Sequence, residues 1–367
     1  MSLVAKFALT RKELTADLIE REQEVDLVLT ALIAQEHVLL VGPPGTGKSM
    51  LADSMSSWMH GNRFGILVTK FTTPEEVFGP ISVAGLKIDR YRRVTTGKLP
   101  EADVAFIDEI FKASSAILNT MLRVLNERKF DNDGTTVDCP LKLCIGASNE
   151  WPGEGEGGKE LGALFDRFLL RKLVRPVATE KGMNRLLWTP DLLPKLSTTL
   201  SQVELEQATA EARALLWTAE AKEAFASIHR EAKKEGIIPG DRRLRKSVRA
   251  TQAFAWLNGA KQVEPDHLEI LSHVLWDDPT DQPRKLAEIV CQIANPSAMQ
   301  VNTLLIEAEQ IIQDTDGKDL AKTSTAVKKL GEITKKLKGM TGQRAEDAKA
   351  HVEEKVKEIK LATISSF

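Results

Sequence analysis

Residues 42–49 read Gly42-Pro43-Pro44-Gly45-Thr46-Gly47-Lys48-Ser49 and match the phosphate-loop pattern G-x-x-x-x-G-K-[ST] at every defined position. An apolar run, His37-Val38-Leu39-Leu40-Val41, precedes the loop, and the pattern after it predicts a helix over residues 48–59. In this context the glycines let backbone N–H groups face phosphate oxygens, and the helix N-terminus adds its positive dipole. Lys48 can then reach the β- and γ-phosphates, and Ser49 can ligate Mg²⁺. We therefore predict a nucleotide site at residues 42–49.

Two further apolar runs end in polar residues that suit the same site. Residues 104–107 precede Asp108 and Glu109, and residues 141–147 precede Ser148 and Asn149. Because ligands of open parallel sheets bind at the carboxyl ends of the strands, we expect these side chains beside the phosphates. Asp108 can hold Mg²⁺, and Glu109 can act as general base on the attacking water. Asn149 can place an amide near the γ-phosphate, with a simple cap or turn residue as the alternative.

Strands of nearly continuous hydrophobicity that alternate with helices predict an α/β fold with a parallel sheet covered on both faces. We assign residues 1–176 to this nucleotide-binding core. The strand signal then disappears, and residues 177–296 show helical patterns, which predict a helical lid domain; the patterns lie at 205–217, 219–235, 242–258 and 265–275. Residues 297–367 alternate Lys and Glu around apolar positions at helical spacing, which predicts a helical C-terminal extension.

The composition excludes several classes of protein. The 367 residues carry 50 Lys+Arg and 52 Asp+Glu, and this net charge of −2 argues against a globally basic nucleic-acid binder. A hydrophobic fraction of 42% excludes a disordered chain. The three cysteines form no CxxC pair, which argues against a zinc site or a disulfide framework. The chain has no apolar run of about 18 residues and no visible secretory signal, so we expect no membrane insertion and a cytoplasmic location.

Longer stretches around the motifs resemble one family of proteins. These stretches are FTTPEEVFGP (71–80), GKLPEA (97–102), IDEIFKA (107–113), LNER (125–128) and LFDRF (164–168). With the phosphate loop, the acidic pair and the strand-end asparagine as Walker A, Walker B and sensor 1, the chain resembles the AAA+ ATPase superfamily. Within it, the chain is most similar to the MoxR family and its RavA-type members (regulatory ATPase variant A). The resemblance covers about residues 15–280 and leaves the tail outside.

The resemblance implies that Arg167 is an arginine finger, a residue that reaches the nucleotide bound to a neighbouring subunit. An always-charged, planar donor suits the charge that develops on the γ-phosphate. A surface salt bridge of Arg167 with Asp166 or Glu160 is the alternative. Arg171 is a nearby competitor for the same role.

Two other basic segments gain a role from the resemblance. Arg242 or Arg243, at the start of a lid helix, resembles sensor 2, which would couple the lid to the γ-phosphate. Five Lys and Arg residues occur within residues 242–249, so a solvated basic face is the alternative. Tyr91-Arg92-Arg93 lies in a segment that resembles an insert facing a central pore, with ordinary loop packing as the alternative.

The resemblance implies a Mg²⁺-dependent ATPase that works as a ring, for which six subunits are expected. ATP would lie between core and lid, and its hydrolysis would remodel or mature a protein partner, often one with a von Willebrand factor A domain. A nucleic-acid-associated AAA+ motor is one alternative, against which the balanced charge counts. An ATP-gated assembly switch with little turnover is the other, against which the intact Glu109, Asn149 and Arg167 count.

Overall fold

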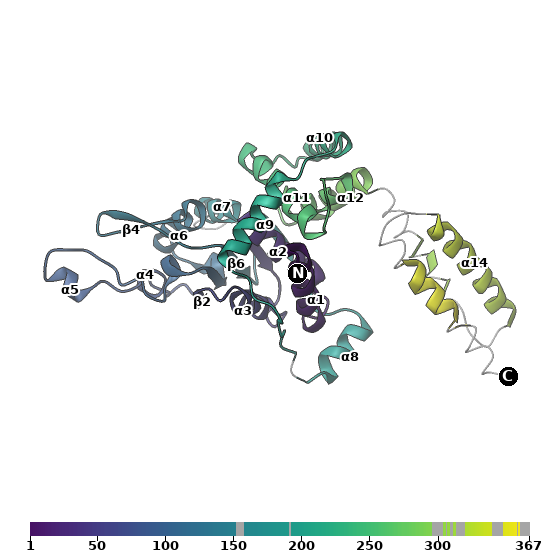
Figure 1. Ribbon diagram of the computed structural model, residues 1–367, viewed down its shortest axis with the longest axis horizontal. Helices are drawn as coiled ribbons and strands as arrows, with labels where there is room; N and C mark the ends of the chain where they lie inside the picture. The colour runs from purple at the N-terminus through teal and green to yellow at the C-terminus, as the bar shows by residue number, and fades with distance from the viewer. Residues whose placement is uncertain are drawn as a thin grey trace.

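The computed structural model describes residues 1–151, 158–190 and 192–295, together with the parts of the tail at 304–305, 307–308, 311–312, 320–339, 348–357 and 359 (Figure 1). A five-stranded sheet lies at the centre of the N-terminal part, in the order β2-β3-β6-β1-β7, and every neighbouring pair is parallel. The predicted α/β class with a parallel sheet is therefore confirmed. The strands are β1 (Val38–Val41), β2 (Arg63–Leu67), β3 (Val104–Asp108), β6 (Leu143–Ser148) and β7 (Leu170–Leu173).

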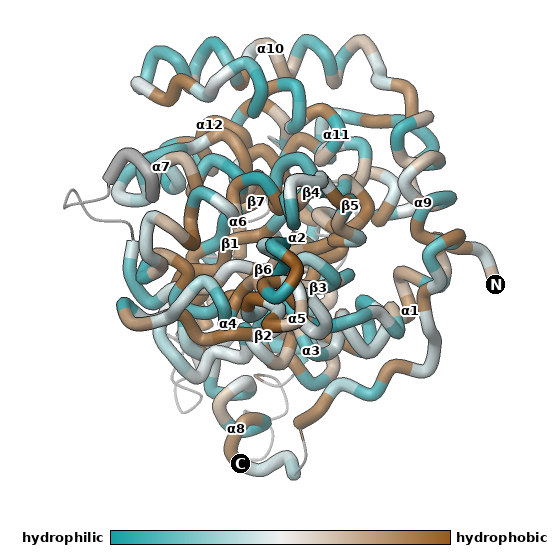
Figure 2. The backbone as a smooth tube through the Cα atoms, turned by 90° about the vertical axis from the view of Figure 1, so that its left-hand side faces the viewer, coloured by the Kyte–Doolittle hydropathy of each residue, from teal (hydrophilic) through white to brown (hydrophobic). Residues whose placement is uncertain are grey.

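Helices cover this sheet and make it the centre of the main hydrophobic core. All residues of β1 and β6 are buried, as expected for strands that are covered on both faces. β1, which consists of four apolar residues, is among the most hydrophobic segments in Figure 2. The surrounding helices are α1 (Leu3–Asp17), α2 (Glu22–Ala34), α3 (Lys48–Met59), α6 (Ser115–Glu127) and α7 (Gly158–Arg167). The helix predicted over residues 48–59 is confirmed as α3.

A projection extends from one end of the core, on the left in Figure 1. It contains α4 (Pro74–Phe78), α5 (Val83–Leu86) and the antiparallel hairpin of β4 (Lys129–Asn132) and β5 (Thr135–Asp138). Asn132 joins its two halves, because its side chain accepts a hydrogen bond from the backbone N of Arg93 at 2.7 Å and donates to the carbonyl of Arg93 at 3.1 Å. Short 3₁₀ turns at Leu99–Glu101 and Ile110–Lys112 flank β3.

The second part of the chain is helical, as predicted. It comprises α8 (Glu180–Trp188), α9 (Gln202–Ala214), α10 (Ala219–Lys234), α11 (Asp241–Leu257), the 3₁₀ segment η3 (Pro265–His273) and α12 (Gln282–Ala294). The sequence pattern missed α8 and α12, and the helix expected at residues 265–275 is a 3₁₀ segment. Several contacts join this lid to the core: for example, Thr209 on α9 donates to the carbonyl of Ile33 on α2 at 3.0 Å.

The tail contains α14 (Leu320–Lys338) and a helical stretch at residues 348–357. Leu330, Ile333, Leu337 and Val352 are buried together in a hydrophobic cluster of their own. The helical character predicted for the extension agrees with this arrangement, although the boundaries at residues 176 and 296 stay a prediction. Among the described helices, none combines the length and the apolar content that a membrane span requires.

Candidate active site at the carboxyl edge of the sheet

The register of the sheet brings the predicted site residues to one edge. Val41, the last residue of β1, pairs with Ser148, and β3 lies on the other side of β6. The phosphate loop, the acidic pair and Asn149 follow the carboxyl ends of these three adjacent strands. Parallel strands present these ends at the same edge, which is where open α/β sheets bind ligands.

The phosphate loop runs from Gly42 into α3, which begins at Lys48. A side chain at Gly42 is sterically excluded, because an added Cβ would stand 2.2 Å from the carbonyl oxygen of Val174. Gly47 caps the helix with a positive φ of 83°, a conformation that favours glycine. The hydroxyl of Thr46 donates to the carbonyl of Pro43 at 3.0 Å and closes the loop on itself. These contacts shape the loop so that its backbone leads directly into the positive end of α3.

Lys48 is buried and folds back onto its own loop. Its Nζ donates to the carbonyl of Gly42 at 2.6 Å and to that of Pro43 at 2.9 Å. Burial lowers the pKa of this amine, and the nearby carboxylates of Asp108 and Glu109 oppose that shift. Ser49 follows on the exposed side of the first turn of α3. An ammonium group held by two carbonyls can exchange them for phosphate oxygens, which are charged acceptors.

Arg21 braces this loop and is a residue that the sequence analysis missed. It is 7% exposed, its Nε donates to the carbonyl of Thr46 at 2.9 Å, and one terminal nitrogen donates to the carbonyl of Arg175 at 2.8 Å. It thereby joins the loop to the segment that follows β7. A lone arginine before a helix carries no motif, so only the fold could reveal this role.

Glu109 follows β3 in a left-handed conformation with a φ of 52°, which is uncommon for a residue other than glycine. Its carboxylate is buried, and Oε2 lies 3.2 Å from Nζ of Lys112 but accepts no hydrogen bond from any residue that the structure describes. The half-buried Asp108 accepts the backbone N–H of Glu109 through Oδ1 at 3.0 Å. The pair therefore offers the carboxylate of Asp108, which a hydrogen bond holds in place, and beside it the buried Oε2 of Glu109, which can still accept a hydrogen bond.

Asn149 comes directly after β6 and is exposed. The hydroxyl of Ser148 donates to the carbonyl of Glu150 at 2.6 Å and accepts the backbone N–H of Glu150 at 3.1 Å. This local turn ends β6, the strand beside β1, and directs the chain away from the sheet. The hydroxyl of Ser148 is thus hydrogen-bonded to the backbone, and the amide of Asn149 lies on the surface at this edge of the sheet.

A cleft of about 1090 Å³ lies between the core and the lid, and Arg21 lines it. Its walls come from the start of α2, from β7 and the segment after it, and from η3 and α12. Arg21 also lines a small pocket with Thr46, Gly47 and Lys48, so the cleft adjoins the phosphate loop. The volume slightly exceeds the range of about 300–1,000 Å³ that is typical of small-molecule and cofactor sites.

Two family models match the chain. The model described as the MoxR domain in the MoxR-vWA-beta-propeller ternary systems matches residues 5–209, more than half of the chain. The chain belongs to the MoxR family of AAA+ ATPases. A model of an AAA lid domain matches residues 220–290, which contain α11, η3 and most of α10 and α12. The predicted family is thereby confirmed, whereas the narrower RavA-type resemblance stays a prediction.

Relatives extend this similarity over most of the MoxR-family chain. The uncharacterized protein MJ0812 of Methanocaldococcus jannaschii is 35% identical over 363 residues, which cover 95% of both chains. The chaperone MoxR1 of Mycobacterium tuberculosis is 29% identical over 159 residues, or 42% of this chain and 40% of its own. A solved structure from Cytophaga hutchinsonii, described as a candidate ATPase, superposes with a TM-score of 0.60 at 15% identity, covering 79% of this chain and 97% of that one. This last likeness concerns the fold alone.

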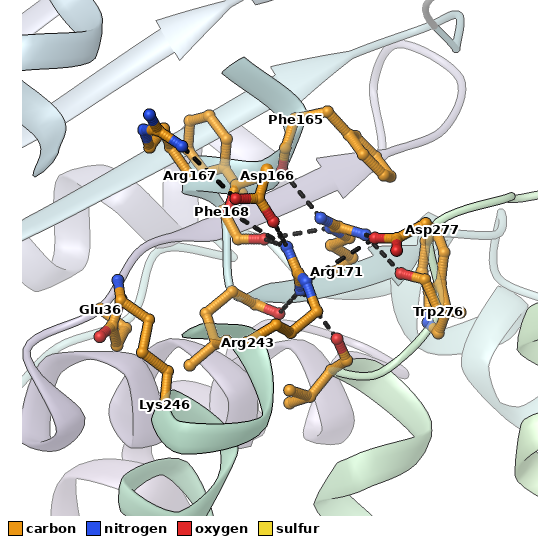
Figure 3. A network of polar contacts seen from close by, with 12 residues as sticks. Glu36, Phe165, Asp166, Arg167, Phe168, Arg171, Arg243, Lys246, Trp276 and Asp277 are labelled. Atoms are coloured by element: carbon orange, nitrogen blue, oxygen red, sulfur yellow. Dashed lines mark hydrogen bonds and ion pairs between the residues drawn. The ribbon is translucent and has the colours of Figure 1, made fainter. Parts of the chain in front are cut away.

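The two finger candidates of this MoxR-family chain differ sharply in access (Figure 3). Arg167 ends α7, and its side chain is 23% exposed and 3.4 Å from Asp166. Arg171 is fully buried, and its guanidinium donates to the carbonyls of Phe165 and Phe168 at 3.0 Å each. A side chain committed in this way is not presented to a neighbour, so the geometry favours Arg167 over Arg171.

The sensor 2 candidates lie at the start of α11. Arg242 is exposed, whereas Arg243 is 3% exposed and forms an ion pair with Asp166 at 3.0 Å. In the described part of the MoxR-family chain, no hydrogen bond or ion pair joins Arg243 to Lys48 or to the acidic pair. The structure therefore brings Arg243 to the segment around Asp166 and Arg167 rather than to the phosphate loop. A contact of either arginine with the γ-phosphate stays a prediction.

The basic segment at residues 91–93 belongs to the projection. Tyr91 is 60% exposed, while Arg93 donates to the carbonyl of Gly79 at 2.7 Å and pairs with Glu75 at 3.4 Å. Arg93 thus fixes the shape of the projection, and Tyr91 and Arg92 are the exposed members of the segment. Whether this segment touches a substrate chain stays a prediction.

Proposed function

We propose that this MoxR-type protein hydrolyses ATP in a Mg²⁺-dependent reaction, assembles as a ring of six subunits, and remodels or matures a protein partner. The observation that carries the proposal is the meeting of Lys48, Asp108 and Glu109 at one edge of the sheet beside a cleft between core and lid. A nucleotide site needs groups such as Lys48 and Asp108, and hydrolysis additionally needs a base such as Glu109.

The residues present fit a nucleotide with Mg²⁺. The loop has no Cβ at Gly42 where the backbone passes Val174, Nζ of Lys48 is held by two carbonyls, and Ser49 is exposed at the first turn of α3. Ser49 and Asp108 would hold the metal, which when bound neutralises charge on the phosphate oxygens. The cleft that Arg21 lines offers room for the rest of the nucleotide.

The chain's own residues supply the remaining functions. Lys48 exchanges its two loop carbonyls for phosphate oxygens, and the residues of the phosphate loop, 42–47, present backbone N–H groups. Glu109 takes a proton from the attacking water through the buried oxygen that accepts no hydrogen bond from the described residues. Asn149 orients that water with its amide. Arg167 of one subunit reaches the nucleotide of the next and stabilises the charge that develops there.

The partner follows from the family. The matching model is described by its occurrence in MoxR-vWA-beta-propeller ternary systems, and this supports a protein partner with a von Willebrand factor A domain. The relative MoxR1 is described as a chaperone, which supports remodelling as the outcome of turnover. The two alternatives are a nucleic-acid motor and an assembly switch with little turnover. The cytoplasmic location is retained from the sequence as part of this proposal.

Turnover, assembly and the finger can be tested with one set of proteins. Wild-type protein should release phosphate from ATP with Mg²⁺ and not with excess chelator, and Glu109→Gln should retain bound ATP in a larger assembly by light scattering. Loss of the base should reduce turnover by about 10²–10⁴-fold. Mixing Arg167→Ala with Glu109→Gln should restore activity, because a composite site then holds Glu109 from one subunit and Arg167 from the other.

Three outcomes would contradict parts of this proposal. ATP-dependent assembly without turnover, with or without a partner, would favour the switch. Steeply salt-dependent DNA binding with stimulated turnover would favour the nucleic-acid motor. Absence of recovery at every mixing ratio would remove the role of Arg167 between subunits.

A further inference from the structure

The turn that joins α7 to β7 is held from both sides by buried arginines (Figure 3). From the core, Arg171 donates to the carbonyls of Phe165 and Phe168 at 3.0 Å each. From the lid, Arg243 on α11 donates to the carbonyl of Asp166 at 3.1 Å. The last carbonyls of a helix lack partners within the helix, and cations suit this negative end. The residue at the end of α7 is Arg167, so the segment that presents the finger depends on a residue of the lid.

The contacts of Arg243 make the position of this turn depend on the position of the lid. Its guanidinium also donates to the carbonyl of Leu169 at 3.0 Å, on the core side, and to that of Val274 at 2.8 Å, within the lid. Asp277, which follows η3, lies 3.0 Å from Arg171 and 3.7 Å from Arg243. A displacement of the lid from the core would therefore have to break the contacts between Arg243 and the turn.

Asp166 is shared between the lid and the finger. Its Oδ1 lies 3.0 Å from Arg243, and its Oδ2 lies 3.4 Å from Arg167. Nε of Arg167 is buried and has no hydrogen-bond partner among the residues that the structure describes, so those residues hold the guanidinium only loosely. One carboxylate thus serves two competing cations, and the shorter contact goes to the lid.

We propose that Asp166 couples the position of the lid to the availability of Arg167. While Arg243 is docked, it holds Oδ1 of the carboxylate at 3.0 Å and leaves Arg167 only the longer contact with Oδ2 at 3.4 Å, which the nucleotide of the neighbouring subunit can replace. When the lid moves away, Asp166 binds Arg167 within its own subunit and withdraws it. Asp166 is a positioning residue in this scheme, and the scheme rests on the proposed role of Arg167 between subunits.

The test uses mixed rings in which one subunit supplies the finger and the other hydrolyses. Glu109→Gln is the finger donor and Arg167→Ala is the receiver, so the recovered ATP turnover reports the donor's Arg167. Adding Asp166→Asn to the donor should raise recovered turnover about two- to fivefold, because an exposed ion pair of this kind is weak but real. The same change in the receiver should have no effect.

Arg243 provides the opposing arm of the test. Arg243→Gln in the donor should lower recovered turnover several-fold, because the carboxylate is then left to Arg167 alone. Combining it with Asp166→Asn should bring turnover back to that of the Asp166→Asn donor. The loss caused by Arg243→Gln should also shrink at about 0.5 M salt, where a half-exposed pair is screened. A purely structural defect would not be reversed by a second substitution or by salt.

A matched control is Asp53→Asn in the donor. Asp53 pairs with Arg63 on the surface, and its side chain is 54% exposed against 47% for Asp166. It should leave recovered turnover unchanged. If the Arg243→Gln donor does not fold, the Asp166→Asn arm still decides the matter.

The outcomes separate the two proposals. An Asp166→Asn donor that leaves recovered turnover unchanged or lowers it overturns the coupling and leaves the finger in place. Equal effects in donor and receiver also overturn it. If the parent mixture recovers no activity at any ratio, the role of Arg167 between subunits fails, and the coupling fails with it.

Discussion

The guanidinium of Arg171 lies over the ring of Phe165, with its central carbon 3.6 Å from the ring centroid. The two residues belong to β7 and α7, and their stacking closes the turn between them. Burial lowers the pKa of Arg171, Arg243 adds to that shift, and Asp277 opposes it. The cation is kept in place by the N–H groups of its planar guanidinium, each of which donates to a defined acceptor.

Replacing Arg171 by Lys should therefore destabilise the protein although the charge is retained. Lysine cannot reach the carbonyls of Phe165 and Phe168 together, and a buried acceptor left without a partner costs about 1–3 kcal/mol. We expect a loss of about 2–4 kcal/mol in the free energy of unfolding, measured with denaturant. Arg242→Lys, on the exposed side of α11, is the control and should change little. Equal stabilities of the two variants would show that the ring contact and the paired hydrogen bonds of Arg171 do not stabilise the protein.

Lys48→Ala should abolish measurable nucleotide binding. Its amine is the buried cation at the phosphate loop, and charge-assisted hydrogen bonds are about twice as strong as neutral ones. We expect affinity for a fluorescent ATP analogue to fall about 100-fold or more, with thermal stability unchanged in the absence of nucleotide. Lys12→Ala, at an exposed position of α1, should bind as the wild type does. Near-wild-type affinity of Lys48→Ala would refute the phosphate site.

Gly42→Ala should distort the loop without removing any functional group. The added Cβ would stand 2.2 Å from the carbonyl oxygen of Val174, so either the loop or the segment after β7 must shift. Overpacking of this kind costs about 1–3 kcal/mol. We expect lower stability together with weaker nucleotide binding. Gly162→Ala, where nothing lies within 4 Å of the added Cβ, should instead be neutral or slightly stabilising.

The stability of the protein should fall as the pH drops below about 6.5, in part through His37. This side chain is 1% exposed; Nδ1 accepts the backbone N–H of Cys144 at 3.0 Å, and Nε2 bonds the carbonyl of Leu125 at 2.9 Å. Protonation would place a second N–H against that of Cys144. Burial, with the charge of Arg128, holds the pKa of His37 well below its usual range, so the unfolded chain takes up the proton first.

The sign of this effect can be measured directly. Below pH 6.5 the depressed pKa makes unfolding more favourable, by up to about 1.4 kcal/mol per pH unit. Denaturant unfolding at pH 6.5 and 5 should give a flatter dependence for His37→Gln than for wild type, whatever the variant's absolute stability. His60→Asn, at an exposed position, should keep the wild-type dependence. Parallel curves for His37→Gln and wild type would show that His37 does not titrate on unfolding.

The central strands and the strand, loop and helix around the candidate phosphate site could be predicted because their signals are local. A buried strand followed by glycines and a helix is written in consecutive residues, as in residues 38–59. The edge strands escaped prediction for physical reasons. In β2 only Phe64 is fully buried, and in β7 Arg171 and Lys172 occupy positions where apolar residues mark a buried strand.

The contact between the lid and the segment that contains Arg167 could not be predicted. Asp166 and Arg243 are 77 positions apart, and no periodicity connects them. The motif at residues 164–168 pointed to Arg167 and treated Asp166 only as a surface partner. The distinction between Arg167 and Arg171 also needed the fold, because the two share charge and neighbourhood in sequence and differ only in burial.

The hydrophobic cluster of the tail, around Leu330 and Val352, shares no residue with the main cluster around the sheet. Two sets of side chains that do not interlock are expected to lose their structure in separate cooperative steps. A calorimetric scan of the whole chain should then contain a small heat-absorption peak beside a large one. The melting temperature of each variant should accordingly be taken from the large peak, which reports the unit that contains the nucleotide site.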